Sequence, residues 1–227
     1  MAELQLYSYA ACPFAQRTRM VLAEKAIDFD LIEVDVYDKP EGWETISPYG
    51  KVPCLRHHGG TIYESTIINE YLDEAFPEPA LMPAGALQRA QARIWMDYCE
   101  TRFLPATHRL MRERDDLEQR ATNLDNLYAV LRFIEREGLR RLSDGPFWFG
   151  DSPTLVDFQY LPFFERFAVY EELAGLEWPP DCSRLRAWLD AMVERDSVKP
   201  TLRPLAYHLE QQRRLAERIA QKQQTAS

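Results

Sequence analysis

A proline-rich segment about a third of the way along the chain separates two parts with different residue patterns. Residues 76–85 read Phe-Pro-Glu-Pro-Ala-Leu-Met-Pro-Ala-Gly, with three prolines and one glycine in ten positions. Proline removes a backbone donor and interrupts helices and strands, so this segment favours neither. A chain of 227 residues can form two modest domains. We therefore predict a first domain at residues 1–78, a linker at 79–85 and a second domain at 86–227.

The part before the linker alternates strand and helix patterns. We expect strands at residues 4–7, 29–36, 52–55 and 61–63, and helices at 13–25 and from Ser65 onward. The residues His57–Gly60 indicate the turn of a hairpin between the last two strands. A strand–helix–strand start implies a parallel pair, and the hairpin adds an antiparallel pair. The pattern predicts an α/β domain with a mixed four-stranded sheet and helices on both faces.

Strand patterns nearly vanish after the linker. Helical spacing of apolar residues recurs at 87–112, 123–137, 154–170 and 185–194. The polar stretch at 211–218 is typical of a surface helix. The second domain is therefore expected to be all-α.

Charge and cysteine placement narrow the classes of function. The formal net charge of −9 argues against a broad nucleic-acid surface, although it is compatible with a local basic pocket for a small anion. No run of 18 or more apolar residues occurs and the first residues lack a signal core, so we expect neither a membrane segment nor export. The four cysteines match no zinc spacing. We expect free thiols in a reducing cytoplasm and no metal cofactor.

Cys12 stands where the first expected strand meets the first expected helix. Pro13 suits the first helical position, which places Cys12 at the N-cap. The free backbone N–H groups and the positive end of the helix dipole there favour a thiolate, and Arg17 and Arg19 are close in sequence. We therefore expect a nucleophilic thiol with a lowered pKa, reactive well below about pH 8.5. The alternative is a buried N-cap cysteine with no chemical role.

Ala15 occupies the position at which a second cysteine would complete a Cys-x-x-Cys motif. Without that partner Cys12 cannot close a disulfide within the motif, so an external thiol must resolve any mixed disulfide. Cys54 falls inside an expected strand and is interpreted as core, and Cys99 and Cys182 are interpreted in the same way. The pattern predicts one-thiol chemistry with a small thiol cosubstrate.

Two further positions suggest a peptide-like ligand. Pro53 either lies on an edge strand or follows a cis bond that turns the backbone of Val52 outward to pair with an extended ligand. Ser65 either only caps the next helix or, with Glu64, binds the carboxylate and ammonium groups of an α-amino acid. Each residue alone leaves both interpretations open.

The chain resembles the cytosolic glutathione transferases, and most closely their omega-like, cysteine-type branch. The similarity is carried, in the family's order, by Tyr9–Leu22, Lys39–Pro40, Ser47–Pro53, Ile62–Ser65 and Glu70–Glu74. It is dense over residues 4–83 and thinner afterwards, where residues 150–157 resemble the family's capping box with Thr154 and Asp157. The resemblance implies a thioredoxin-like N-terminal domain and an all-helical C-terminal domain.

The resemblance also implies a catalytic thiol, Cys12, that forms a mixed disulfide with glutathione. The family's cosubstrate-binding positions correspond here to Phe14, Lys39, Val52, Pro53, Glu64 and Ser65. Lys39 would reach the glycine carboxylate of glutathione, and Val52 would pair with its cysteinyl backbone. Pro53 would be the cis-proline, and Glu64 with Ser65 would bind the γ-glutamyl end. The family further implies a cytoplasmic homodimer that acts on a small-molecule electrophile or disulfide.

We expect a thiol transferase or reductase of the dehydroascorbate-reducing or deglutathionylating type. One alternative is conjugation of glutathione to small electrophiles, for which Tyr7, Ser8 or Tyr9 would supply a hydroxyl donor. Another is a non-enzymatic interaction protein on the same fold, a class that need not keep the glutathione-binding residues. Retention on immobilised glutathione separates that last class from the enzymes.

Overall fold

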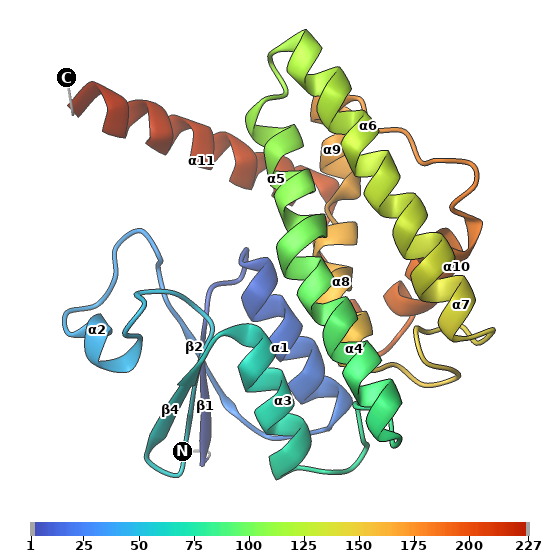
Figure 1. Cartoon of the computed structure of the whole chain (residues 1–227). Coiled ribbons are helices and arrows are strands. Elements are labelled where there is room, and N and C mark those ends of the chain that lie inside the picture. Colours follow the sequence, from blue (N-terminus) through green and yellow to red (C-terminus); the bar gives the residue numbers. More distant parts are fainter. Residues whose placement is uncertain (1–2, 226–227) are drawn as a thin grey trace.

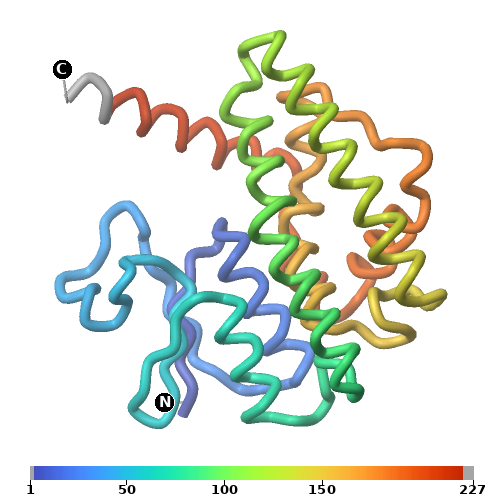
Figure 2. Tube along the Cα trace, in the orientation of Figure 1, coloured from blue at the N-terminus to red at the C-terminus, as the bar shows by residue number. Residues whose placement is uncertain are grey.

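A computed structural model describes residues 3–225 (Figures 1 and 2). The N-terminal part contains a four-stranded sheet in the order β2-β1-β3-β4. Its strands are β1 (Leu4–Ser8), β2 (Asp30–Glu33), β3 (Cys54–His57) and β4 (Gly60–Tyr63). β1 runs parallel to β2 and antiparallel to β3, and β3 runs antiparallel to β4. The predicted mixed sheet is confirmed.

The two faces of the sheet are covered differently. Helices α1 (Pro13–Glu24) and α3 (Ser65–Ala75) pack against each other on the face toward the helical domain, and α2 (Trp43–Ile46) lies away from that domain (Figure 1). Successive strand residues point to opposite faces, so Leu6 of β1 enters the main core and Tyr7 enters a smaller cluster with Trp43. The strand–helix alternation thus produces the expected layers.

One strand is shorter than the sequence pattern predicts, and another is displaced by two residues. β2 has only four residues, although residues 29–36 were expected to form a strand. β3 begins at Cys54 because Pro53, just before it, has no N–H to give to the ladder. The hairpin closes through His58 and Gly59, with φ of 49° and 77°, the positive values that a two-residue type I′ turn requires.

Two long helical rods form one side of the C-terminal part. The first runs through α4 (Ala86–Tyr98), the π-helical turn η1 (Cys99–Phe103) and α5 (Leu104–Arg112). The second runs through α6 (Leu117–Phe133), η2 (Ile134–Leu139) and α7 (Arg140–Leu142). The remaining elements are α8 (Leu155–Phe164), α9 (Phe167–Ala174), α10 (Ser183–Val193), the short η3 (Lys199–Thr201) and α11 (Leu205–Thr225). The expected helical domain is confirmed.

Helix α8 is the centre of the C-terminal part. All ten of its residues are buried, as expected for a helix with neighbours on every side. It packs against α1, α3 and α4 and so joins the helical part to the sheet part. The expected capping box is present at its start, where the Asp157 carboxylate accepts hydrogen bonds from Thr154 N (2.7 Å) and Thr154 Oγ1 (2.8 Å).

The expected helix at 154–170 is interrupted. α8 ends at Phe164 and α9 begins at Phe167, so Glu165 and Arg166 form a corner between two helices. This corner faces the N-terminal part and matters for the site described below. The helix expected at 123–137 instead begins at Leu117, where Asp116 caps it through its carboxylate.

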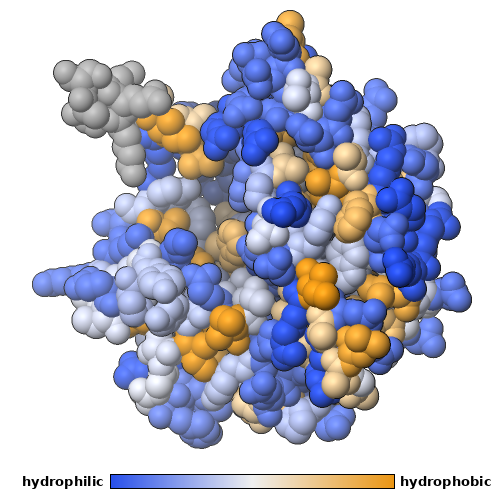
Figure 3. Space-filling model, in the orientation of Figure 1, coloured by the Kyte–Doolittle hydropathy of each residue, from blue (hydrophilic) through white to orange (hydrophobic). Residues whose placement is uncertain are grey.

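Helix α11 extends away from the bundle (Figures 1 and 2). The predicted surface helix at 211–218 is part of this longer element, whose apolar residues Leu215 and Ile219 are exposed. Exposed apolar surface also lies over α4, where Leu87 and Ile94 are exposed (Figure 3). No helix within residues 3–225 combines the length and apolar character needed to cross a membrane.

Candidate functional site

Cys12 caps the N-terminus of α1, as the sequence predicts. Its backbone is extended (φ −76°, ψ 118°), and Pro13 occupies the start of the helix. Its sulfur lies 3.7 Å from the carbonyl oxygen of Val52, in the segment that precedes β3. The other three cysteines are buried, whereas Cys12 keeps part of its surface exposed. Burial raises the pKa of Cys99 to about 12 and that of Cys182 to about 11, so both are inert at neutral pH.

The expected lowering of the pKa of Cys12 is wrong for the chain by itself. Burial raises the pKa of this thiol above its ordinary value, and that effect is the largest. The backbone N–H groups of Ala15 and Phe14 oppose it, as do the charges of Arg166 and Arg19. The helix terminus therefore acts in the predicted direction but does not outweigh the loss of solvent around the sulfur.

Arg166 reaches from the corner between α8 and α9 to the segment that carries Cys12. Its Nη2 donates a hydrogen bond of 3.2 Å to the carbonyl oxygen of Ala11. Its Nη1 donates to Gln16 Oε1 (2.9 Å) and to the carbonyl oxygen of Pro162. One buried guanidinium thus holds the residue before Cys12, contacts α1 and places positive charge near the thiol.

The neighbouring Glu165 connects the same corner to α11. Its carboxylate accepts hydrogen bonds from Gln16 Nε2 (2.5 Å) and from the backbone N of Arg203 (2.8 Å), and it lies 3.1 Å from His208 Nε2. Burial alone would raise the pKa of Glu165, but His208, Arg166, Gln16 and Arg203 together bring it below its usual value. The start of α11 is therefore fixed to the helix that Cys12 caps.

A pocket of about 80 Å³ lies next to Val52, whose carbonyl oxygen contacts the Cys12 sulfur, although Cys12 itself is not among its lining residues. It is lined by Phe14, Ser47, Tyr49, Lys51, Val52, Pro53, Tyr63, Glu64 and Ser65. Five of the six expected cosubstrate residues are among them: Phe14, Val52, Pro53, Glu64 and Ser65. The Val52–Pro53 bond is cis, which selects the cis alternative over the simple edge-strand proline.

Ser65 differs from its predicted role as the helix cap. Glu64 takes the N-cap position of α3 with a φ of 70°, and Ser65 is the first helical residue. The Ser65 hydroxyl accepts a hydrogen bond of 3.2 Å from Arg17 Nη1. Arg17 is fully buried and pairs with Glu100 of η1 at 2.6 Å, so its charge is balanced by that carboxylate. Arg19, by contrast, is oriented toward the Cys12 loop, where it donates to Tyr9 and Ala10 carbonyl oxygens.

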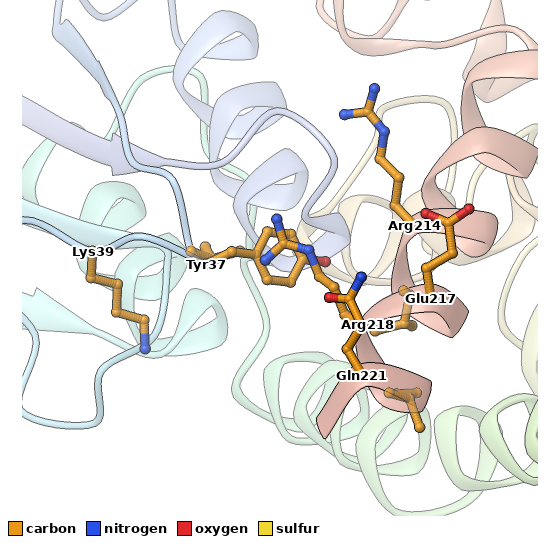
Figure 4. Close-up of a pocket in the computed structure, with 9 residues that line it drawn as sticks. Tyr37, Lys39, Arg214, Glu217, Arg218 and Gln221 are labelled. Atoms are coloured by element: carbon orange, nitrogen blue, oxygen red, sulfur yellow. The ribbon is translucent and has the colours of Figure 1, made fainter. Parts of the chain in front are cut away.

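Lys39 is the one expected cosubstrate residue that does not line this pocket. Its exposed side chain borders a second, larger cleft of about 980 Å³ between the segment after β2 and helix α11. Figure 4 shows Lys39 and Tyr37 on one wall of that cleft and Arg214, Glu217, Arg218 and Gln221 on the other. A Cβ added at Gly50 would lie 3.5 Å from Lys39 Nζ, so the ammonium group lies near the rim of the small pocket.

The side chains of Tyr7, Ser8 and Tyr9, which were expected to supply a hydroxyl donor in a conjugating enzyme, are engaged in other contacts. Ser8 is fully buried and its hydroxyl accepts a hydrogen bond of 2.6 Å from Arg19 Nη1. Tyr9 donates to Gln211 Oε1 of α11 at 3.2 Å, and Tyr7 is buried against Trp43. None of the three lines the small pocket, and neither does Cys12, but Cys12 contacts the carbonyl oxygen of Val52 at its wall.

Sequence reasoning did not identify Arg166, Gln16 or Glu165. The first and last lie at a helix break that the apolar pattern does not reveal, and Gln16 is an ordinary polar residue of a helix. Tyr49, Lys51 and Tyr63 were likewise not proposed as lining residues, although they flank residues that were. Only the tertiary fold brings the corner at 165–166 to the segment before Cys12.

Comparison with known protein families finds two matches along the chain. A model described as glutathione S-transferase, N-terminal domain, matches residues 6–80. A model described as glutathione S-transferase, C-terminal domain, matches residues 115–191. The first range contains Cys12 and the small pocket, and the second contains the Glu165–Arg166 corner.

Individual proteins show the same similarity. Glutathione S-transferase U24 of Arabidopsis thaliana is 31% identical over 202 residues, which are 88% of this chain and 89% of that protein. Glutathione S-transferase omega-1 of mouse is 33% identical over 198 residues, 86% of this chain and 78% of that protein. The crystal structure of rice GST1 in complex with glutathione superposes with a TM-score of 0.85 and 32% identity, covering 95% of this chain and 99% of that chain.

Proposed function

The chain belongs to the glutathione S-transferase family, and we propose that it is a glutathione-dependent thiol transferase that reacts through Cys12. The observation that carries the proposal is the position of the Cys12 sulfur, at the open end of α1 and 3.7 Å from the Val52 carbonyl oxygen. Ala15 leaves no second thiol in the motif, so the resolving thiol must come from a cosubstrate. Family membership supplies glutathione as that cosubstrate.

The small pocket suits one end of glutathione. A tripeptide is larger than about 80 Å³, so only its γ-glutamyl end would enter between Glu64 and Ser65. The free backbone N–H groups at the start of α3 would receive the carboxylate, and Glu64 would pair with the ammonium group. The cysteinyl part would then extend along Val52 toward Cys12, and Lys39 or Lys51 would pair with the glycine carboxylate.

The proposed reaction has two exchange steps. The Cys12 thiolate attacks the glutathione sulfur of a mixed disulfide, which forms a Cys12–glutathione disulfide and releases the second thiol after it takes up a proton. The thiolate of a second glutathione then attacks the glutathione sulfur of the enzyme adduct, so that oxidised glutathione leaves and the Cys12 thiolate is restored. One glutathione thiol is oxidised for each thiol released, because the glutathione sulfur of the substrate is already part of a disulfide and leaves as the other half of oxidised glutathione.

The surroundings of Cys12 fit a thiol that needs activation during turnover. Burial keeps the proton on the sulfur, and Arg166, Arg19 and the amides of Phe14 and Ala15 work against it. Reaction therefore depends on this positive potential, because the thiolate is the attacking form. The same potential would stabilise the thiolate as leaving group in the second step.

Glutathione conjugation is the competing activity, and the relatives named above do not exclude it. A conjugating enzyme needs a donor beside the glutathione sulfur, whereas Ser8 and Tyr9 are engaged by Arg19 and Gln211. The Cys12 thiol, by contrast, contacts the carbonyl oxygen of Val52, which lines the pocket. A non-enzymatic scaffold is the remaining alternative.

The test compares Cys12→Ser with the parent enzyme in exchange between glutathione and a small glutathione mixed disulfide. We expect turnover to fall by at least about a hundredfold while the variant is still retained on immobilised glutathione. Cys12→Ala serves as the matched control that also removes the hydroxyl. Undiminished exchange in both variants would refute the thiol mechanism. Failure of the parent enzyme to bind the glutathione matrix would favour the scaffold.

We further propose that the enzyme acts in the cytoplasm as a homodimer. All four cysteines are unpaired, which suits a reducing compartment. Exposed apolar residues on α4, Leu87 and Ile94, suit a contact between subunits. Sedimentation equilibrium of the purified chain tests the dimer, and a mass near that of one chain would exclude it.

A further inference from the structure

A cluster of metal-ligating side chains lies at the end of the sheet remote from Cys12. It consists of Glu3 before β1 and the neighbouring His57 and His58 at the β3–β4 turn. Each residue offers one ligand atom, and the three atoms lie within 4.8 Å of one another. Residues 54 positions apart in the sequence meet because β1 and β3 are paired in register, with Leu4 opposite His57.

The hairpin turn brings the two imidazoles together. Adjacent strand residues normally point to opposite faces, but His58 has a φ of 49° and leaves the strand path. Its ring therefore stacks on that of His57, with ring centroids 3.9 Å apart and an angle of 28°. The Nδ1 atom of His58 lies 2.6 Å from Glu3 Oε1.

His57 has a hydrogen-bond partner on one of its two ring nitrogens. Its Nδ1 lies 2.7 Å from the hydroxyl oxygen of Tyr71, and its ring also packs against Phe76. A hydrogen-bond partner on one ring nitrogen fixes the ring and its tautomer and leaves the other nitrogen for a metal. The side chain is largely buried, so its orientation is set by packing rather than by the ligand.

We propose that Glu3, His57 and His58 form a binding site for a divalent transition metal, with Zn²⁺ as the best match. Two imidazoles and one carboxylate are a donor set that zinc accepts, with solvent in the fourth position. Tetrahedral zinc requires donor atoms about 3.4 Å apart, as follows from its bond lengths. The His58 ring would turn out of its stack on His57 so that the two nitrogen lone pairs converge on one ion, and side-chain exposures of 65% for His58 and 68% for Glu3 leave room for that rotation.

The charges around the site favour a cation. The cleft of which these residues are part is also lined by Asp28 and Glu78. Lys25, the one lysine on its wall, is paired with Asp73 at 2.8 Å and donates to two backbone carbonyl oxygens. The bound metal would replace the direct contact between His58 and Glu3 and would connect the segment before β1 to the hairpin.

The test is a zinc titration of the full chain by calorimetry and by competition with a chromophoric chelator. It uses a Cys12→Ser background, because the other three cysteines are buried and Cys12 is not. We expect one saturable Zn²⁺ per chain. Glu3→Gln and His58→Asn should each weaken binding at least about tenfold, and asparagine tolerates the positive φ at this turn. Tyr71→Phe, which keeps the packing, should weaken it by a similar factor.

His108→Asn is the matched control, since His108 lies on α5 and outside the cluster. It should leave zinc affinity unchanged. Zinc should also raise the melting temperature of the parent chain and not that of His58→Asn. Equal zinc affinity in the parent, Glu3→Gln and His58→Asn, or no saturable binding in the parent, would overturn the proposal. Neither result depends on glutathione or on catalysis.

Discussion

Replacing Arg166 by methionine tests how the helical domain controls the reactive thiol. The guanidinium donates to the carbonyl oxygens of Ala11 and Pro162 and to Gln16 Oε1, and it pairs with Glu165. Methionine fills much of the same volume but leaves these acceptors without their donor. Each lost hydrogen bond in a buried site costs about 1 kcal/mol, and more where a charge is involved.

We expect Arg166→Met to lower the free energy of unfolding by about 2–4 kcal/mol. Glu165 keeps His208, Gln16 and the Arg203 amide as partners, so it is not left as a bare buried charge. For a chain of this size the loss corresponds to a melting temperature lower by roughly 5–12 °C. Differential scanning calorimetry provides that measurement.

The same variant should change the chemistry in a way that a purely structural loss does not. Arg166 lowers the pKa of Cys12, so its removal should move the pH dependence of alkylation by iodoacetamide to higher pH. Loss of the contact to Ala11 should reduce thiol-exchange turnover by roughly tenfold, because the attacking sulfur is less well placed. Arg166→Lys keeps the positive charge but lacks the several N–H donors of the guanidinium, so its turnover and alkylation profile should lie between those of the parent enzyme and Arg166→Met.

An Arg166→Met enzyme that is folded, has an unchanged alkylation profile and retains full exchange activity would show that Arg166 does not control Cys12. A lower melting temperature alone, with an unshifted profile, would assign Arg166 to stability and not to positioning of Cys12. The assay is run at temperatures below the melting transition of each variant.

The Cys12 thiol, the Lys39 ammonium group and the Asp157 cap can each be tested by a single measurement. Burial raises the pKa of Cys12, so the rate of alkylation should still be increasing at about pH 9, and a plateau below about pH 8 would contradict this. Lys39→Met should raise the KM for glutathione by roughly five- to twentyfold with little change in kcat, since it removes a carboxylate partner; an equal loss in kcat would point to another role. Asp157→Ala should destabilise the fold by about 3 kcal/mol in urea unfolding, because Thr154 N, Trp148 N and Trp188 Nε1 all donate to that buried carboxylate, whereas a loss below about 1 kcal/mol would contradict the capping account.

Local sequence signals account for much of the fold. Alternating apolar residues located β1, the Cys12–Pro13 pair located the start of α1, and Thr154 with Asp157 located the start of α8. These predictions succeed because the cause lies within a few residues of the effect. The corner at Glu165–Arg166 was missed because apolar residues continue on both sides of it, and only its contacts with Ala11 and Gln16 explain it.

The site shows the same division between local and distant causes. The N-cap position of Cys12 could be predicted, but the direction of its pKa shift could not, because desolvation comes from elements that the local sequence does not name. Ser65 was predicted as a cap, whereas the positive φ of Glu64 moves the cap back by one residue. Cysteine spacing predicts no metal site, whereas Glu3 is brought to His57 and His58 only by the pairing of β1 with β3.

The central claim is that Cys12 carries glutathione during turnover, and a mass measurement tests it most directly. The chain is incubated with oxidised glutathione, the reaction is stopped with acid, and the intact mass and its peptide fragments are recorded. We predict the addition of one glutathione per chain, located on Cys12, absent in Cys12→Ser and removed by reduced glutathione. An unmodified chain, or an adduct on Cys54, Cys99 or Cys182 with Cys12 free, would contradict the account.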